Sequence, residues 1–132
     1  MKEQLGFSMP LLIPHRYKLV HNSYIMAKIL FLLMDEKRLP TSLVIAKNSL
    51  NRYEDVKVII LGEALKALKS LDEEGLAALE ELQKRGAIDS ACFYSAEKEG
   101  IKDDVLDMGI TLAPIGERMA KYINQGYVPL TF

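Results

Sequence analysis

The stretch KILFLLM, residues 28–34, decides the fold class of this chain, because all but its first residue are apolar. It is followed by the charged residues 35–38, so it is far too short to cross a bilayer and has the length of one buried strand. A second run, VKVIIL at residues 56–61, ends at Gly62 in the same way. Such continuous apolar runs are typical of parallel strands, which need helical crossovers between them.

Helical patterns follow these two runs. We expect a helix over residues 41–50, where Leu43, Ala46 and Leu50 recur at spacings of three and four. A short helix is expected over residues 63–68. The alternation of strand and helix favours an α/β fold.

The clearest helix signal lies between Ser70 and Gly86. Ser70 and Glu73 have the spacing of a capping box, and Gly86 suits a left-handed helix end. Gly75 inside this helix costs up to about 1 kcal/mol relative to alanine. The expected apolar stripe consists of Leu76, Leu79 and Leu82.

The remaining third of the chain continues the alternation. Further strands are expected at 87–93, 110–112 and 127–131, and helices at 95–99 and 114–123. Pro114 suits the first turn of its helix. Pro129 removes a backbone donor, so the last strand is expected at an edge of the sheet.

These elements predict a mainly parallel sheet with helices on both faces. Right-handed crossovers place the ends of parallel strands on one rim, and ligands of open α/β sheets bind beyond that rim. The residues expected there are Asp35, Gly62, Glu63, Cys92 and Pro114.

The 132 residues form one domain by size, and residues 1–25 do not follow the alternation. We therefore divide the chain into an extension at residues 1–25, of uncertain role, and a single α/β domain at residues 26–132. The extension has no continuous apolar core with a cleavage site, so no signal peptide is expected. His15 and His21 lie in it and match no common metal motif, and no metal or cofactor is expected.

The composition narrows the class of function. Seventeen basic and eighteen acidic residues give a net charge of −1, which disfavours nucleic acid as a partner. No segment is long and apolar enough for a membrane span. One cysteine cannot form an internal disulfide, so the reducing cytoplasm is the expected compartment.

That single cysteine, Cys92, is the main candidate for chemistry. It ends an expected strand and precedes an expected helix, where backbone N–H groups favour the thiolate. The alternative is a buried cysteine that only fills space. Gly62, Glu63, Tyr94 and Ser95 are candidates for a ligand-binding rim around it, although Glu63 better suits a solvated first helical turn and Ser95 equally suits a helix N-cap.

Spacing around Cys92 resembles the DsrE/DsrF-like family of sulfur-handling proteins, which includes the TusD-type sulfur-relay subunits. Gly100 and Ile101 follow the cysteine at the family's interval. The segments Val58–Glu63, Gly109–Leu112 with Gly116, and Tyr127–Phe132 are similar to the family's other strands and turns. The likeness spans residues 28–132.

The resemblance implies an α/β/α fold with a largely parallel five-stranded sheet, assembled as trimers or hexamers. It also implies a persulfide on Cys92, exchanged with donor and acceptor proteins. Several relatives have a second cysteine where this chain has Asp89, so a dithiol mechanism is closed to it. The preferred hypothesis is a sulfurtransferase-like sulfur carrier; the alternatives are a non-catalytic assembly subunit and a small-ligand-binding module.

Overall fold

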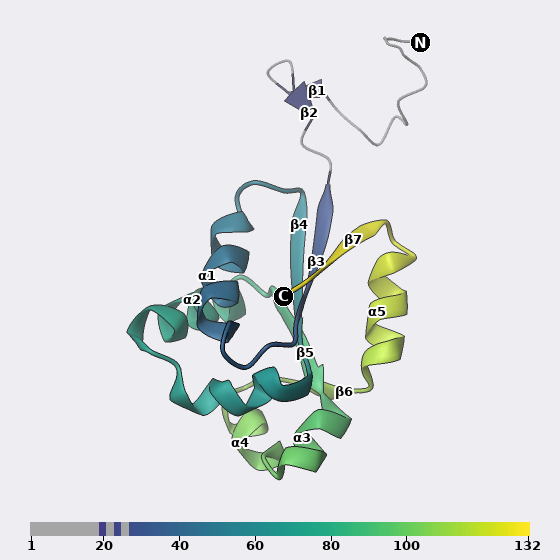
Figure 1. The fold of residues 1–132 in the computed structure, drawn as a ribbon. Coiled ribbons are helices and arrows are strands. Elements are labelled where there is room, and N and C mark those ends of the chain that lie inside the picture. The colour runs from purple at the N-terminus through teal and green to yellow at the C-terminus, as the bar shows by residue number, and fades with distance from the viewer. Residues whose placement is uncertain (1–18, 21–22, 25–26) are drawn as a thin grey trace.

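A computed structural model describes residues 19–20, 23–24 and 27–132 of the chain (Figure 1). Its strands are β1 (Leu19–Val20), β2 (Ser23–Tyr24), β3 (Lys28–Leu33), β4 (Asp55–Ile60), β5 (Ile88–Cys92), β6 (Leu112–Ala113) and β7 (Tyr127–Thr131). Its helices are α1 (Leu39–Ser49), the 3-10 helix η1 (Gly62–Ser70), α2 (Glu73–Lys84), α3 (Phe93–Glu99), α4 (Lys102–Asp107) and α5 (Ile115–Ile123). β1 and β2 pair as a short antiparallel ladder, and the rest of the extension, with His15 and His21, lies outside the described residues.

Five of these strands form one sheet in the order β6-β5-β4-β3-β7, and every neighbouring pair in it is parallel. The predicted α/β fold with a parallel five-stranded sheet is therefore confirmed. β7 lies at one edge, as Pro129 indicated. The sheet is open at its other edge along the two residues of β6.

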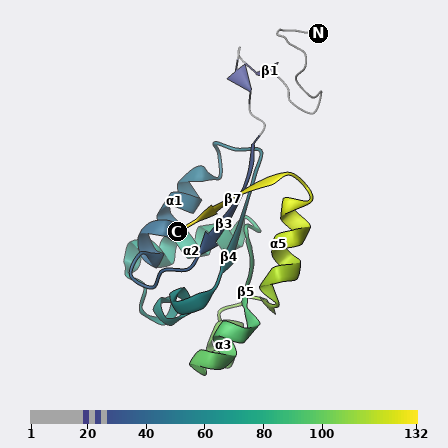
Figure 2. The same ribbon diagram turned by 45° about the vertical axis from the view of Figure 1, so that its right-hand side comes forward.

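Helices cover both faces of the sheet, but unequally (Figures 1 and 2). α1 and α2 lie against one face together with η1, whereas α5 crosses the other face alone, because it connects β6 to β7 at the opposite edge. No helix among the described residues is both long and apolar enough to span a membrane.

Two apolar clusters result from the alternation of side chains along the strands. Ile29, Phe31 and Leu33 of β3 pack with Leu43 of α1 and Leu79 of α2 on the first face. Leu30 and Leu32 pack with Ile115 and Tyr122 of α5 on the second. β3 is therefore buried from Ile29 to Leu33, which explains its almost wholly apolar sequence.

The structure corrects the predicted start of α2. Asp72 is the N-cap, and its carboxylate accepts the N–H of Gly75 at 2.7 Å. Ser70 belongs to η1, and its hydroxyl donates to the carbonyl of Ala67. The expected capping box of Ser70 and Glu73 is wrong because an aspartate one residue before the helix competes more effectively for its first N–H groups.

The apolar stripe of α2 also differs from the prediction. Leu79 and Leu82 are buried as expected, but Leu76 is 42% exposed. The face towards α1 instead includes Gly75 and Ala78, both buried. A Cβ atom added at Gly75 would lie 3.2 Å from Cβ of Pro40, so the glycine permits the close approach of the two helices.

Other predicted elements match with small shifts. The segment expected as a short helix at 63–68 is the longer 3-10 helix η1. Pro114 is the N-cap of α5 rather than its first helical residue. Gly86 has a φ of 72°, which confirms the left-handed end of α2.

Replacing Gly75 by alanine is expected to destabilise the protein by about 1 kcal/mol, although alanine is the better helix former. The new methyl group would lie 2.9 Å from Oδ1 of Asp72 and would displace the cap. Gly116 in α5 has open space around its Cβ position and is the matched control: Gly116→Ala should stabilise by up to about 1 kcal/mol. Urea unfolding measures both, and an increase in stability for Gly75→Ala would contradict this interpretation.

Candidate functional site

The carboxyl ends of β3, β4, β5 and β6 meet at the lower rim of the sheet in Figure 1. Cys92 is the last residue of β5, and Pro114 directly follows β6. Asp35 and Gly62 each lie two residues beyond their strands. The predicted rim residues therefore do follow four neighbouring strand ends.

Cys92 is held at the corner between β5 and α3. It is the N-cap of α3, and its Sγ accepts the backbone N–H of Ser95 at 3.4 Å. The thiol is half-buried. The predicted helix entrance at Cys92 is confirmed.

Ser95 has a different role from the N-cap suggested by the sequence, because Cys92 occupies that position. The hydroxyl oxygen of Ser95 accepts the N–H of Gly62 at 2.9 Å. This hydrogen bond connects the corner after β4 to the corner after β5. Gly62, Ser95 and Cys92 therefore form a continuous chain of two hydrogen bonds.

The paths of the chain after β5 and β6 diverge at this point. After β5 the chain turns to the α1 face, where Ala96 and Val105 are part of the first apolar cluster. After β6 it turns to the opposite face, where Ile115 belongs to the second cluster. Cys92 pairs with Ala113 of β6, so it lies where neighbouring strands send their connections to opposite faces. This is the position at which open parallel sheets bind ligands.

An irregularity in β5 decides which face Cys92 occupies. Val58 and Ile59 of β4 are consecutive, but they pair with Ile88 and Ser90 of β5, so Asp89 is an extra residue. Ile88 and Ala91 consequently pack on the α1 face, although three positions separate them. The next residue, Cys92, packs against the cluster under α5, as Leu61 and Met119 also do.

Asp89 itself faces α5 by ordinary alternation, because it follows Ile88, which packs on the α1 face. Oδ1 of Asp89 accepts Nη2 of Arg118 and the hydroxyl of Tyr122, each at 2.6 Å. Oδ2 accepts Nε of Arg118 at 2.9 Å and the hydroxyl of Ser90 at 2.8 Å. The Asp89 side chain is only 5% exposed, so this carboxylate anchors α5 to the sheet from a buried position.

The pKa values of the side chains in this cluster are strongly shifted. Burial of Asp89 by itself raises the pKa of its carboxyl, but the hydrogen bonds from Arg118, Tyr122 and Ser90 outweigh it and lower the pKa to about 2. Burial and the hydrogen bond to Asp89 raise the pKa of Tyr122 to about 12. The hydrogen bond to Asp89 raises the pKa of the Arg118 guanidinium above its usual range. The cluster is therefore a permanently charged pair at neutral pH.

A second polar contact lies at the amino ends of the strands. The hydroxyl of Tyr127 donates to Asp55 of β4, and burial together with this bond raises the pKa of Tyr127 above its usual range. The rings of Tyr122 and Tyr127 meet edge to face at 4.9 Å. Both clusters hold the chain around α5 and β7 rather than the rim.

Sequence reasoning missed the cluster of Asp89. One signal was available: Arg118 and Tyr122 have the i, i+4 spacing that places both on one face of a helix. A carboxylate inside an otherwise uncharged strand needs such partners. The bulge at Asp89 has no comparable signal in the sequence.

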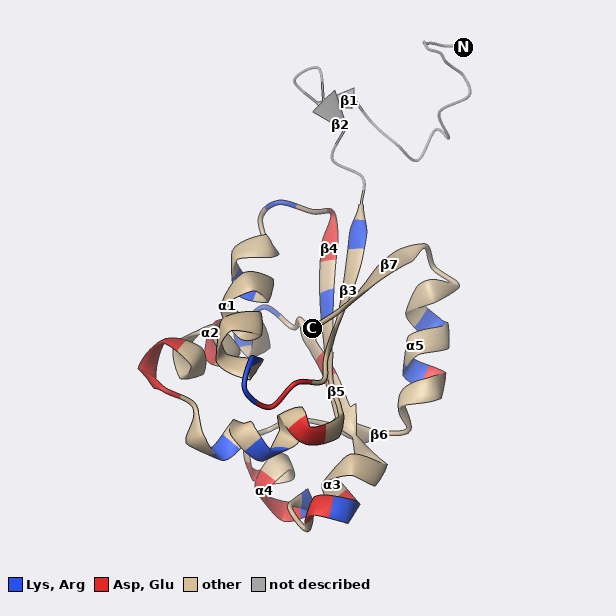
Figure 3. Ribbon diagram, viewed as in Figure 1, with Lys and Arg blue, Asp and Glu red and all other residues tan. Residues whose placement is uncertain are grey.

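The other predicted rim residues are more exposed. Glu63 lines a shallow groove of about 350 Å³ with Met34, Asp35, Glu36 and Lys37. Tyr94 is 64% exposed and its ring packs edge to face on Phe93. Acidic and basic residues are mixed around α3 (Figure 3), where Lys66 pairs with Glu99 and Lys102 with Glu97.

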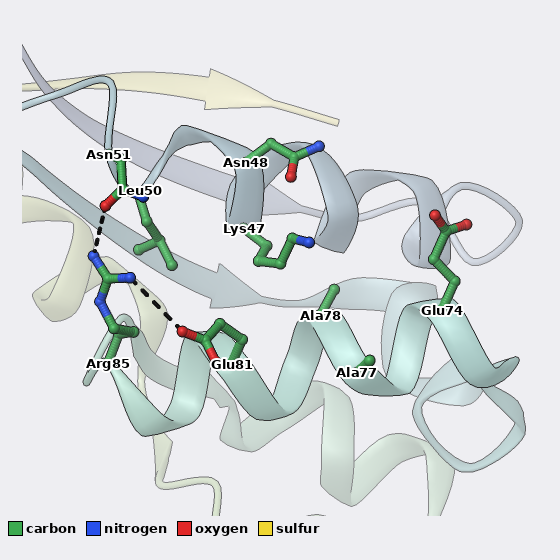
Figure 4. Close-up of a pocket in the computed structure, with 9 residues that line it drawn as sticks. All are labelled: Lys47, Asn48, Leu50, Asn51, Glu74, Ala77, Ala78, Glu81 and Arg85. Carbon is green, nitrogen blue, oxygen red and sulfur yellow. Dashed lines mark hydrogen bonds and ion pairs between the residues drawn. The ribbon is translucent and has the colours of Figure 1, made fainter.

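A further groove of about 520 Å³ lies between α1 and α2 (Figure 4). Its floor includes Ala77 and Ala78. Arg85 closes one end by contacting Asn51 at 3.1 Å and Glu81 at 3.7 Å. Lys47 projects into the groove from α1. Its mixed charges specify no single class of ligand.

Within the part of the chain that the structure describes, no three His, Cys, Asp or Glu side chains are placed to hold a metal ion. The fold and the rim define an α/β protein with an open, parallel five-stranded sheet and one cysteine at its strand ends. No family model and no curated protein matches the chain. Among solved structures it is similar to a conserved protein of unknown function from Bacteroides thetaiotaomicron, with 22% identity, coverage of 80% of this chain and 94% of that chain, and a TM-score of 0.66. At this identity the likeness shows the fold alone.

Replacing Asp89 by asparagine is expected to destabilise the protein by about 3 kcal/mol, because it removes the partner of a partly buried guanidinium. The matched control is Asp104→Asn, which breaks an exposed ion pair with Lys69 at 3.3 Å and should cost less than about 0.5 kcal/mol. Chemical unfolding at neutral pH measures both. Equal losses for the two variants would show that the Asp89 cluster is not an anchor.

Acid unfolding tests the same cluster through its protonation. The folded pKa of Asp89, about 2, lies below its value in an unfolded chain, about 3.9. The stabilisation is thus complete above about pH 4 and is lost as the pH falls towards 2, amounting to between about 2 and 3 kcal/mol. The unfolding free energy of the wild-type protein should fall more steeply across this range than that of Asp89→Asn. Parallel curves would contradict the assignment.

Proposed function

We propose that this protein is a sulfur carrier of the sulfur-relay type, with Cys92 as the acceptor of a persulfide sulfur. It would work in the reducing cytoplasm with a donor protein and an acceptor protein, and the sulfurtransferase-like resemblance to DsrE-like proteins motivates this choice. The proposal uses one cysteine only. At position 89, where several relatives have a second cysteine, this chain has an aspartate that binds Arg118 and Tyr122.

The chemistry requires a thiolate and no change of net redox state. The Cys92 thiolate attacks the outer sulfur of a donor persulfide, a new S–S bond forms on Cys92, and the donor S–S bond breaks. The donor leaves as a thiolate and the proton remains on the transferred sulfur. Transfer to an acceptor thiolate repeats these steps in the opposite direction.

The observation that supports this proposal most is the position of the Cys92 thiol. It lies at the point where the connections after β5 and β6 diverge, and its sulfur accepts the N–H of Ser95. Cys92 is half-buried rather than enclosed in the core. A cysteine that only fills space needs neither a position at the strand ends nor a hydrogen-bond donor to its sulfur.

A homo-oligomeric assembly subunit is the second candidate. The open edge of β7 favours it, because Val128 and Leu130 are 47% and 38% exposed there. In this case Cys92 would have no chemical role, so Cys92→Ser would keep both the oligomer and the biological activity. An oligomer by itself is also compatible with the carrier, so the need for Cys92 is what separates the two candidates.

Incubation with a small-molecule persulfide donor, followed by intact mass measurement, tests the carrier. The wild-type protein should gain one sulfur atom, which dithiothreitol then removes. Cys92→Ser should gain none, because no other thiol is present. Absence of the gain in the wild-type protein, or an equal gain in the variant, would rule the carrier out.

A further inference from the structure

We infer that Ser95 is a positioning residue that holds the thiol of Cys92 in a reactive orientation. The inference rests on the proposed function, since it concerns the same sulfur. It assigns to Ser95 a role beyond the N-cap or ligand contact expected from the sequence. It also explains why residue 62 is a glycine.

Two groups of Ser95 act in opposite directions. Its backbone N–H donates to Sγ of Cys92 at 3.4 Å, and its hydroxyl oxygen accepts the N–H of Gly62 at 2.9 Å. The first bond reaches three residues back within one corner, whereas the second reaches across to η1. The neighbouring strand corner therefore restrains the residue that donates to the sulfur.

Gly62 directs its N–H into this arrangement from a left-handed conformation, with a φ of 64°. A side chain at that position has space, since the nearest atom to an added Cβ is the carbonyl oxygen of Met34 at 3.6 Å. The glycine is thus required by backbone conformation rather than by packing. Loss of that conformation would turn the N–H away from Ser95.

The test compares Ser95→Ala with Ser95→Thr in the full-length protein. Alanine removes the acceptor of the Gly62 N–H, and threonine retains it. In Ser95→Ala, iodoacetamide should modify native Cys92 about fivefold more slowly. This factor corresponds to the loss of one ordinary hydrogen bond, the one between Gly62 and the Ser95 hydroxyl. The Gly62 amide should exchange with deuterium about tenfold faster. Ser95→Thr should restore both values, which a loss of packing alone would not explain.

A glycine pair gives an independent measurement should Ser95→Ala fail to fold. Gly62→Ala and Gly100→Ala place alanine at similar left-handed positions, with φ values of 64° and 71°. Both carry the same backbone strain, but only the first lies beside Ser95. Gly62→Ala should slow the alkylation of Cys92, and Gly100→Ala should leave it unchanged.

Unchanged alkylation in both Ser95→Ala and Gly62→Ala, or an equal effect of Gly100→Ala, would overturn the inference. So would a Ser95→Thr variant that behaves like alanine. These rates do not require sulfur transfer. A protein that takes up no persulfide sulfur but shows the expected alkylation pattern would disprove the carrier and retain the role of Ser95.

Discussion

The extra residue of β5 is the constraint on which the rest of the structure depends. Because Asp89 and Ser90 together oppose one step of β4, the side chains beyond them change faces. Cys92, beyond the bulge, therefore faces α5 rather than the larger cluster around α1 and α2. It shares that face with Asp89, which follows Ile88 in ordinary alternation and meets Arg118 and Tyr122 under α5. The bulge thus places the thiol on the same face as the anchor of the crossover helix.

The anchor matters because of the topology. α5 connects β6 at one edge of the sheet to β7 at the other, and it is the helix that covers this face (Figure 2). Apolar contacts of Ile115 and Tyr122 hold it down, but such contacts are non-directional. The paired hydrogen bonds between Arg118 and Asp89 add a fixed geometry. They determine where the helix crosses the face of the sheet on which Cys92 also lies.

Much of the fold was predictable from the sequence, for physical reasons visible in particular residues. The run from Ile29 to Leu33 is buried on both faces, so its composition alone indicated a parallel strand. Pro129 identified the edge strand and Gly86 the end of α2. The predicted start of α2 was wrong because Ser70 and Asp72 are both suitable caps, and only the geometry of η1 decides between them.

The candidate site was predictable only in part. The corner at Cys92 follows from a strand and a helix that meet, and both had local signals. The hydrogen bond between Gly62 and Ser95 joins residues that are 33 positions apart, and its existence depends on the register of two strands. The partners of Asp89 depend in the same way on where α5 crosses the sheet. Local sequence patterns predict the helices and strands of this protein, whereas its polar contacts depend on how those elements are aligned.

The bulge places Cys92, half-buried, at the strand-end rim, and the proposed function requires its thiol to react in the folded protein. The most direct measurement is the rate of Cys92 alkylation by iodoacetamide at neutral pH, in the native protein and in the same chain unfolded in urea. The account predicts that the native thiol reacts at least as fast as the unfolded one, despite its half-burial. A native thiol that reacts orders of magnitude more slowly, and only as fast as the protein unfolds, would identify Cys92 as a core residue and contradict the account.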